Sequence, residues 1–270
     1  MSGQGKQGKE PTILDQLAAH ARERTEEAKG RVPLQEMRRR AMALPKGDRA
    51  FEKALARPGL SFICECKKAS PSKGLIAPSF PYLQIAKEYE EAGADCISVL
   101  TEPKWFLGRD HYLKEITEIV RIPCLRKDFT VDEYMIHEAK VLGASAVLLI
   151  VSILEEAQIR EYLEIAGELG LAALVEAHDE EEIRTALACG AGIIGVNNRN
   201  LKDFSVDTSN SLRISRLIPD GVLFVSESGV RTAADVEELK KAGADAVLIG
   251  ETLMKAADKK AKLSELRGEG

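Results

Sequence analysis

The sequence lacks the features of membrane, secreted and metal-binding proteins. No apolar run reaches the ~18 residues of a membrane-spanning helix, and the first residues, MSGQGKQGKEP, contain no apolar core of a secretion signal. The four histidines (His20, His111, His137 and His178) are scattered, without the paired spacing of metal ligands. We therefore expect a cytoplasmic protein that contacts no membrane and needs no metal or other cofactor.

Cysteine pairs and an excess of positive charge are missing as well. The five cysteines are an odd number, and each lies in or beside an apolar run. Cys64-x-Cys66 has one residue fewer than the spacer of a zinc knuckle, so we expect buried free thiols in a reducing compartment. The net charge of −5 offers no electrostatic footprint for nucleic acid.

The sequence does contain a repeated pattern of helices and strands. A glycine ends a helical stretch before a Val/Ile/Leu run in four segments: EAGADCISVL (91–100), VLGASAVLLI (141–150), ACGAGIIGV (188–196) and KAGADAVLIG (241–250). Further apolar runs alternate with them: FICEC (62–66), PCLRK (123–127), LAALVEA (171–177) and VLFVSES (222–228). Eight short apolar strands separated by helices predict an α/β protein, a (β/α)8 TIM barrel. A doubly wound open sheet is the structural alternative.

The first 60 residues precede the barrel pattern and form an N-terminal helical extension. Helical periodicity covers ILDQLAAHARERTEEAKG (13–30) and PLQEMRRRAMAL (33–44). The extension either covers one end of the barrel or forms a solvated arm. We expect residues 61–270 to fold as a single barrel domain, since barrels of this size commonly do, in a monomer or a weak homo-oligomer.

Charged residues stand at the predicted strand ends, where TIM barrels carry their chemistry. Glu65 and Lys67 end the first strand, and Lys127, Glu176 and Glu227 end the third, fifth and seventh. In the last three cases the charged residue lies two positions after an apolar residue, and so continues an inward-facing row. Lysine and glutamate in a partly dry site provide an acid and a base. The alternative is that each is an ordinary strand-end residue pointing at water.

The last two strand ends carry small residues instead. SGV (228–230) and GET (250–252) begin helical segments, as phosphate-binding turns of barrels do. The carboxylate of Glu251 would repel a phosphate, so we expect only its backbone N–H to contribute. Ordinary tight turns are the alternative interpretation.

Other strand-end residues suggest contacts to the rest of a ligand. Asn197 and Arg199 follow the sixth strand, while the loop PKWFLG (103–108) after the second offers Trp105 and Phe106. Together with Phe129, these aromatic rings predict a flat apolar part in the ligand, and hydrophobic packing onto a helix is the alternative interpretation. The residues thus predict a phosphorylated small-molecule substrate and acid–base chemistry.

Seven motifs then resemble the indole-3-glycerol-phosphate synthase family of tryptophan biosynthesis: ECKKASPSKG, ISVLTEPKWFLG, LRKDF, LVEAH, IGVNNRNL, SESGV and LIGETLM. The resemblance covers essentially the whole chain, and because the sequence contains no second barrel pattern, we expect the monofunctional form of the enzyme. Cys66 and Thr130 depart from the family pattern at positions not expected to touch substrate. The family converts 1-(2-carboxyphenylamino)-1-deoxyribulose 5-phosphate to indole-3-glycerol phosphate, carbon dioxide and water.

The resemblance also implies roles for individual residues. Lys127 is implied to be the general acid of ring closure and Glu176 the base, assisted by Glu65 and Lys67. Which lysine acts in which acid step stays open. Asn197 and Glu227 are implied to complete the catalytic set by orienting substrate hydroxyls and the lysines.

The implied binding residues surround that catalytic set. Arg199 is implied to stabilise the anthranilate-derived end or a neighbouring carboxylate, and Phe106 and Phe129 to sandwich the aromatic ring. The phosphate is implied to lie on Ser228, Gly229, Gly250 and Glu251, with Lys67 and Ser70 adding a charge and a hydroxyl.

Three other functions compete with this one. Phosphoribosylanthranilate isomerase needs a Cys or Asp acid–base pair, and strand alternation turns Cys64 and Cys66 away from Glu65. A Schiff-base aldolase would use Lys67 or Lys127 as a nucleophile. A phosphate-binding barrel without turnover would gain nothing from several buried carboxylates, whose desolvation is costly.

Overall fold

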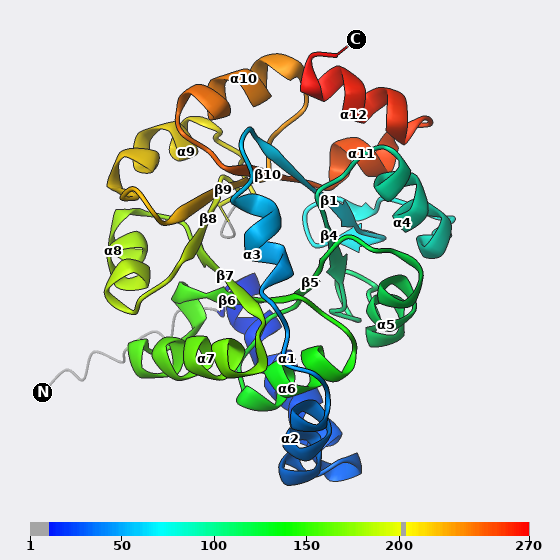
Figure 1. Cartoon of the computed structure of the whole chain (residues 1–270), viewed down its shortest axis with the longest axis vertical. Coiled ribbons are helices and arrows are strands. Elements are labelled where there is room, and N and C mark those ends of the chain that lie inside the picture. Colours follow the sequence, from blue (N-terminus) through cyan, green and yellow to red (C-terminus); the bar gives the residue numbers. More distant parts are fainter. Residues whose placement is uncertain (1–10, 201–203, 270) are drawn as a thin grey trace, which may run out of the picture.

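A closed barrel of eight parallel strands forms the centre of the molecule (Figure 1). The computed structural model describes residues 11–200 and 204–269, so residues 1–10, 201–203 (which include Leu201 of the IGVNNRNL motif) and Gly270 lie outside the described residues. The strand order is β1-β10-β9-β8-β7-β6-β5-β4. The strands are β1 (Ser61–Cys66), β4 (Cys96–Leu100), β5 (Cys124–Lys127), β6 (Ala146–Ile150), β7 (Ala172–Ala177), β8 (Ile193–Asn197), β9 (Leu223–Glu227) and β10 (Ala246–Ile249). The predicted TIM barrel is confirmed.

Helices surround the barrel and connect its strands. They are α4 (Tyr82–Glu91), α5 (Asp110–Ile119), α6 (Glu133–Val141), α7 (Glu156–Leu169), α8 (Glu180–Ala188), α9 (Ser209–Ile214), α10 (Ala233–Lys241), α11 (Glu251–Lys255) and α12 (Lys259–Arg267), with 3-10 turns at Val151–Ile153 and Ser215–Leu217. The repeated glycines Gly93, Gly143, Gly190 and Gly243 have φ between 84 and 91° just after α4, α6, α8 and α10. This left-handed conformation is the helix stop that the sequence repeat predicts.

The loop after β1 contains a small hairpin that the sequence pattern does not reveal. Strands β2 (Ala69–Ser70) and β3 (Gly74–Leu75) pair in antiparallel fashion within KASPSKG and the residue that follows it. Two-residue strands are too short to show alternation, which is the reason they escape a periodicity argument.

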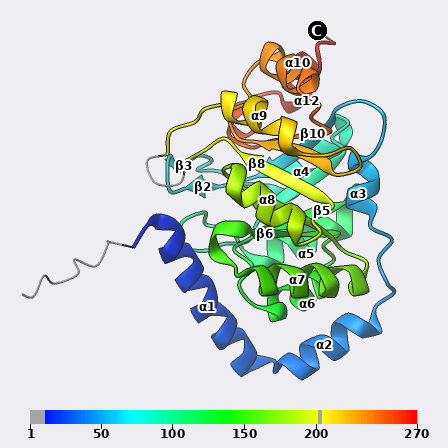
Figure 2. The same ribbon diagram turned by 90° about the vertical axis from the view of Figure 1, so that its left-hand side faces the viewer.

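The N-terminal extension covers both ends of the barrel. It consists of α1 (Ile13–Arg31), α2 (Leu34–Ala43) and α3 (Ala50–Leu55), and Figure 2 shows it passing along one side of the barrel. Ile13 and Leu17 of α1 line the cavity at the carboxyl ends of the strands, whereas Phe51 and Leu55 of α3 pack with the barrel interior. The extension is therefore not a solvated arm.

Apolar side chains fill the barrel in layers. Ile63, Leu125, Leu174 and Val225 lie inside it on alternate strands β1, β5, β7 and β9 and are fully buried. Four side chains from alternate strands are the usual layer of such a barrel. The next inward positions on the same four strands carry the charged residues described below.

Four of the cysteines, Cys64, Cys66, Cys124 and Cys189, lie in the core between the strands and the helices, whereas Cys96 packs with the barrel interior. All five are free and buried, as predicted, and burial raises the pKa of Cys66 well above its ordinary value. Cys64 and Cys66 lie in the outer core cluster, away from Glu65 on the same strand. Among the described helices, none is long and apolar enough to cross a membrane.

Candidate active site

A cavity of about 380 Å³ opens at the carboxyl ends of the strands. Its volume lies within the range of small-molecule sites. It is lined by every residue that the sequence predicts for the site: Glu65, Lys67, Ser70, Phe106, Lys127, Phe129, Glu176, Asn197, Arg199, Glu227, Ser228, Gly229, Gly250 and Glu251. The structure thus brings the whole predicted set to one place.

Four charged side chains form the floor of this cavity. Glu65, Lys127, Glu176 and Glu227 come from β1, β5, β7 and β9, two residues beyond the apolar layer. Each glutamate is at most 3% exposed. Lys127 Nζ donates to Glu176 Oε2 at 2.9 Å and to Glu227 Oε2 at 2.6 Å. The register predicted from the sequence is confirmed, and one ammonium group bridges two carboxylates.

The two carboxylates around Lys127 differ in their affinity for a proton. Burial raises the pKa of Glu227 to about 7, despite the opposing charge of Lys127. Burial acts in the same sense on Glu176, but Lys127, His178 and hydrogen bonds outweigh it and lower its pKa to about 2. Burial lowers the pKa of Lys127, but the two carboxylates raise it by more, so its pKa lies above the ordinary value. The site therefore holds a charged lysine, an ionised glutamate and a glutamate that titrates near neutrality.

A glycine on the neighbouring strand leaves room for the carboxyl group of Glu227. A Cβ atom at Gly195 on β8 would overlap Glu227 Oε1 and lie 3.2 Å from Leu174 Cδ1. Glu227 Oε1 is buried and has no hydrogen-bond partner. A proton on Glu227 would therefore reside on this free oxygen, since Oε2 already accepts from Lys127.

A second ion pair lies beside this group. Lys67 Nζ is 2.6 Å from Glu65 Oε1, and Ser98 Oγ donates to Glu65 Oε2 at 3.4 Å. Gly250 makes room for the pair, because a Cβ there would overlap Glu65 Oε1 and lie 2.8 Å from Lys67 Nζ. The two charged residues that end the first strand are thus paired with each other.

Asn197 and His178 hold Glu176 from the other side. Asn197 Nδ2 donates to Glu176 Oε1 at 3.1 Å, and His178 Nε2 lies 3.4 Å from the same oxygen. The sequence analysis does not assign His178 to the site. Its position two residues after Glu176 indicates that it faces the same side of the strand, and this could have identified it. Glu182 fixes the other ring nitrogen at 3.0 Å. Across residues 11–200 and 204–269, no cluster of His, Cys, Asp or Glu has the arrangement of a metal site.

The turn after β9 has an unusual backbone. Ser228 has φ 67° and Gly229 has φ 96°, and Asn198 Nδ2 donates to the carbonyl of Ser228 at 3.0 Å. Thr252 Oγ1 donates to the carbonyl of Val230 at 2.7 Å and so joins this turn to the start of α11. The two predicted phosphate turns are thus held side by side.

Basic side chains surround the same edge of the cavity. The carboxylate of Glu251 pairs with Lys255 at 2.6 Å and lies 3.8 Å from Lys73 and 3.9 Å from Arg199. Glu251 therefore holds Lys255, Lys73 and Arg199 near this edge, where their positive charges would interact with an anionic ligand. Sequence reasoning assigned it only a backbone contact and missed Lys73 and Lys255.

The aromatic residues form a wall rather than a slot. The rings of Phe106 and Phe129 lie 6.1 Å apart at 41° and contact each other. No third ring fits between them in this arrangement, so the expected sandwich is wrong here, and the pair presents one apolar surface. Trp105 is not part of the wall, because its ring packs against His20 at 5.4 Å.

Known proteins resemble this chain over nearly its whole length. The family described as Indole-3-glycerol phosphate synthase matches residues 14–266. The chain belongs to this family. Indole-3-glycerol phosphate synthase from Ruminiclostridium cellulolyticum is 54% identical over 95% of this chain and 99% of its own length. The synthases of Lachnoclostridium phytofermentans and Endomicrobium trichonymphae are 50% and 52% identical over 94% of this chain and 98% and 99% of theirs.

Solved structures of other families share the barrel of this synthase family. 3-Hexulose-6-phosphate synthase from Salmonella typhimurium superposes with a TM-score of 0.64 at 15% identity, over 77% of this chain and 97% of that one. Thiamine phosphate pyrophosphorylase from Pyrococcus furiosus gives 0.60 at 18% identity, over 81% and 96%. At such identities the likeness concerns the fold alone.

Proposed function

We propose that this protein catalyses the reaction for which its family is named. The substrate is 1-(2-carboxyphenylamino)-1-deoxyribulose 5-phosphate, and the products are indole-3-glycerol phosphate, carbon dioxide and water. The observation that supports the roles of individual residues is the contact of Lys127 with both Glu176 and Glu227 on the cavity floor. This makes the protein a carbon–carbon lyase of tryptophan biosynthesis.

Lys127 is the general acid of ring closure. The ring carbon that bears the carboxylate attacks the C2′ ketone, and the C=O electron pair moves to oxygen. Lys127 remains protonated, because two carboxylates face it in a buried site, and it donates a proton to this oxygen as the charge develops. Loss of carbon dioxide from the tetrahedral ring carbon then returns its bonding electrons to the ring.

Glu176 is the base of the final dehydration. Its pKa of about 2 keeps it ionised at neutral pH, and Asn197 fixes one of its oxygens. Glu176 removes a proton from the intermediate while an acid delivers a proton to the departing hydroxyl, which leaves as water. Lys67, next to Glu65, and Lys127 are the two candidate acids.

The walls of the cavity suit the two ends of the substrate. The phosphate lies on the backbone of Ser228, Gly229, Gly250 and Glu251, with Lys67 and Ser70 nearby. The contacting rings of Phe106 and Phe129 cover one face of the anthranilate ring. Arg199 lies at the cavity edge within 3.9 Å of Glu251 and supplies a positive charge there.

Steady-state assays of the purified protein test this assignment. Appearance of indole-3-glycerol phosphate is followed by its fluorescence. We expect Lys127→Ala and Glu176→Gln each to lower kcat by two orders of magnitude or more, as loss of general acid–base catalysis does. Lys29→Ala is the matched control, since Lys29 also pairs with a carboxylate but lies outside the cavity lining. Near-normal turnover in either active-site variant would overturn the role given to that residue.

A trapping experiment tests the rival aldolase, and the position of the cysteines argues against the isomerase. A Schiff base at Lys67 or Lys127 would be trapped by borohydride with a keto substrate, and we expect no adduct by mass spectrometry. The isomerase would need a Cys or Asp at the end of the first strand, where this chain has Glu65, and Cys64 and Cys66 lie in the outer core. We also propose a reducing, cytoplasmic setting, which suits five buried free thiols.

A further inference from the structure

Two buried carboxylates outside the cavity floor hold the backbone of the aromatic wall. Glu102, just after β4, accepts the backbone N–H groups of Trp105 at 2.8 Å and Phe106 at 3.0 Å. Asp128, just after β5, accepts the backbone N–H of Phe129 at 2.8 Å. Both carboxylate side chains are 0% exposed. Each phenylalanine of the wall is thus fixed at its backbone by one buried acidic residue.

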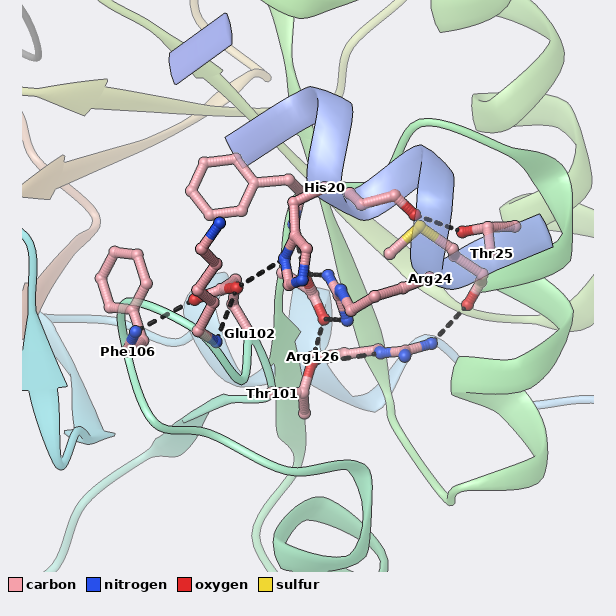
Figure 3. Close-up of polar contacts among 12 residues, drawn as sticks. His20, Arg24, Thr25, Thr101, Glu102, Phe106 and Arg126 are labelled. Carbon is pink, nitrogen blue, oxygen red and sulfur yellow. Dashed lines mark hydrogen bonds and ion pairs between the residues drawn. The ribbon is translucent and has the colours of Figure 1, made fainter. Parts of the chain in front are cut away.

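Helix α1 supplies a partner to each of these carboxylates (Figure 3). Arg24 contacts both oxygens of Asp128, with Nη2 to Oδ1 at 2.7 Å and Nη1 to Oδ2 at 3.2 Å. His20 Nδ1 lies 3.2 Å from Glu102 Oε1. His20 and Arg24 are four residues apart and therefore share one face of the helix. The N-terminal helix thereby reaches both residues that hold the wall.

Asp128 is the more tightly held of the two. Thr101 Oγ1 donates to its Oδ2 at 2.6 Å. Burial would raise the pKa of Asp128, but the charges of Arg24 and Arg126 and these hydrogen bonds keep it below the ordinary value. Asp128 is therefore ionised at neutral pH, and the two-point contact with Arg24 is charge-assisted.

We propose that Arg24 and His20 are positioning residues that set the aromatic wall of the cavity by holding Asp128 and Glu102. The inference rests on the proposed role of Phe106 and Phe129 in binding the aromatic ring of the substrate. Neither α1 residue lines the cavity, so Arg24 acts through Asp128, and His20 acts through Glu102 and through its ring contact with Trp105. Since the wall contacts the substrate before and during the reaction, its misplacement weakens binding throughout and raises KM more than it lowers kcat.

A matched control lies on the same helix. Lys29 Nζ pairs with Asp132 Oδ2 at 2.7 Å and so also joins α1 to the barrel. Asp132, however, caps α6 through the backbone N–H of Tyr134 and contacts no residue of the aromatic wall. Lys29→Gln therefore removes the ion pair of α1 with the barrel, together with the pair of Lys29 with Glu26 inside the helix, and leaves the wall untouched.

The first measurement compares KM and kcat of Arg24→Gln and Lys29→Gln. We expect Arg24→Gln to raise KM about tenfold with kcat changed by less than about threefold, the signature of lost uniform binding. Lys29→Gln is expected to leave KM within about twofold, as exposed ion pairs contribute little. Equal KM values for the two variants would overturn the inference.

A double-mutant cycle distinguishes positioning from a general loss of structure. If Arg24 acts through Phe129, the effect of Arg24→Gln on KM shrinks at least severalfold in a Phe129→Leu background, whereas it stays unchanged in a Phe106→Leu background. Additive effects in both backgrounds would refute the inference. A normal KM in Phe129→Leu itself would instead refute the proposed role of the wall.

If Arg24→Gln does not fold, the kinetics of His20→Asn test the same inference. His20 is 21% exposed, so His20→Asn removes a partly solvated group. We expect the effect of His20→Asn on KM to shrink in the Phe106→Leu background and to stay unchanged in the Phe129→Leu background. A KM equal to that of the unsubstituted enzyme, or the reverse pattern of coupling, would contradict the inference.

Discussion

The substitution Glu227→Gln tests the electrostatics of the cavity floor without relying on activity. A glutamine amide has the shape of a protonated carboxyl, and its NH2 group takes the place of the free oxygen Oε1. Its remaining oxygen still accepts from Lys127, as Oε2 does in the native enzyme. The variant therefore imitates the enzyme with a proton fixed on Glu227.

The pH dependence of stability follows from the raised pKa of Glu227. Between about pH 4.5, the ordinary value, and about pH 7, the folded state binds a proton that the unfolded state has released. The free energy of unfolding therefore falls as the pH rises through this range. A difference of about 2.5 pKa units corresponds to roughly 3 kcal/mol at 1.36 kcal/mol per unit. Below the range both states are protonated, and above it both are ionised.

Urea unfolding at several pH values between 4.5 and 8 measures this contribution. We expect the difference in unfolding free energy, Glu227→Gln minus native, to rise by roughly 3 kcal/mol from the acidic to the alkaline end. Glu26→Gln removes a carboxylate that is 72% exposed and serves as the control for a change in net charge. Its difference from the native enzyme is expected to stay constant across the same range.

Kinetics provide a second, independent measure of the same group. The pH profile of kcat/KM reports on groups of the free enzyme, so we expect an inflection near pH 7 that Glu227→Gln lacks. If the stability difference for Glu227→Gln is as flat as that for Glu26→Gln, the carboxyl of Glu227 is not protonated near neutrality in the folded state. Burial would then not raise the pKa of Glu227 above its ordinary value.

Further substitutions test how the floor is accommodated and paired. Gly195→Ala places a methyl group onto Glu227 Oε1, so we expect kcat to fall about 100-fold while the circular dichroism spectrum is retained. Gly250→Ala should lower kcat in the same way, because its methyl group displaces the pair of Glu65 with Lys67. An unchanged kcat in both variants would contradict the role of these glycines in packing. Lys127→Met leaves two buried carboxylates without their cation, for an expected loss of about 3–5 kcal/mol in unfolding free energy. Lys29→Met, whose ion pair with Asp132 is about a quarter exposed, should lose about 0–1 kcal/mol of unfolding free energy. Equal losses in Lys127→Met and Lys29→Met would refute the expected difference between a buried and a partly exposed pair.

The barrel and its charged floor are predictable because they depend on local rules. Helix stops at Gly93 and its three counterparts recur at similar intervals of 50, 47 and 53 residues, and an apolar strand follows each one. Strand alternation then puts Lys127, Glu176 and Glu227 on the inner face without any knowledge of their partners. The closed order of strands adds that these residues come from alternate strands and form one layer.

The contacts of the N-terminal helix were not predictable in the same way. Arg24 and Asp128 are 104 residues apart in the chain, and nothing local to either residue indicates the other. The expected ring sandwich failed for a related reason, because the distance between Phe106 and Phe129 depends on two different loops. Strand alternation predicts which face of a strand a residue occupies, and capping rules predict where a helix ends. Which residues of different elements contact each other depends instead on how the loops pack.

The charged floor is also the costliest layer of this barrel, and its packing indicates that it is retained for chemistry. The layer beneath it is entirely apolar, and an apolar layer of similar volume above would avoid the desolvation of several ionised groups. Glycines at positions 195 and 250 give up side chains to leave space for Glu227 and for the pair of Glu65 with Lys67. A protein under selection for stability alone would fill that space. A synthase must instead keep an acid, a base and a group that titrates near neutrality within one dry layer, and the alternate strands of the barrel bring them there.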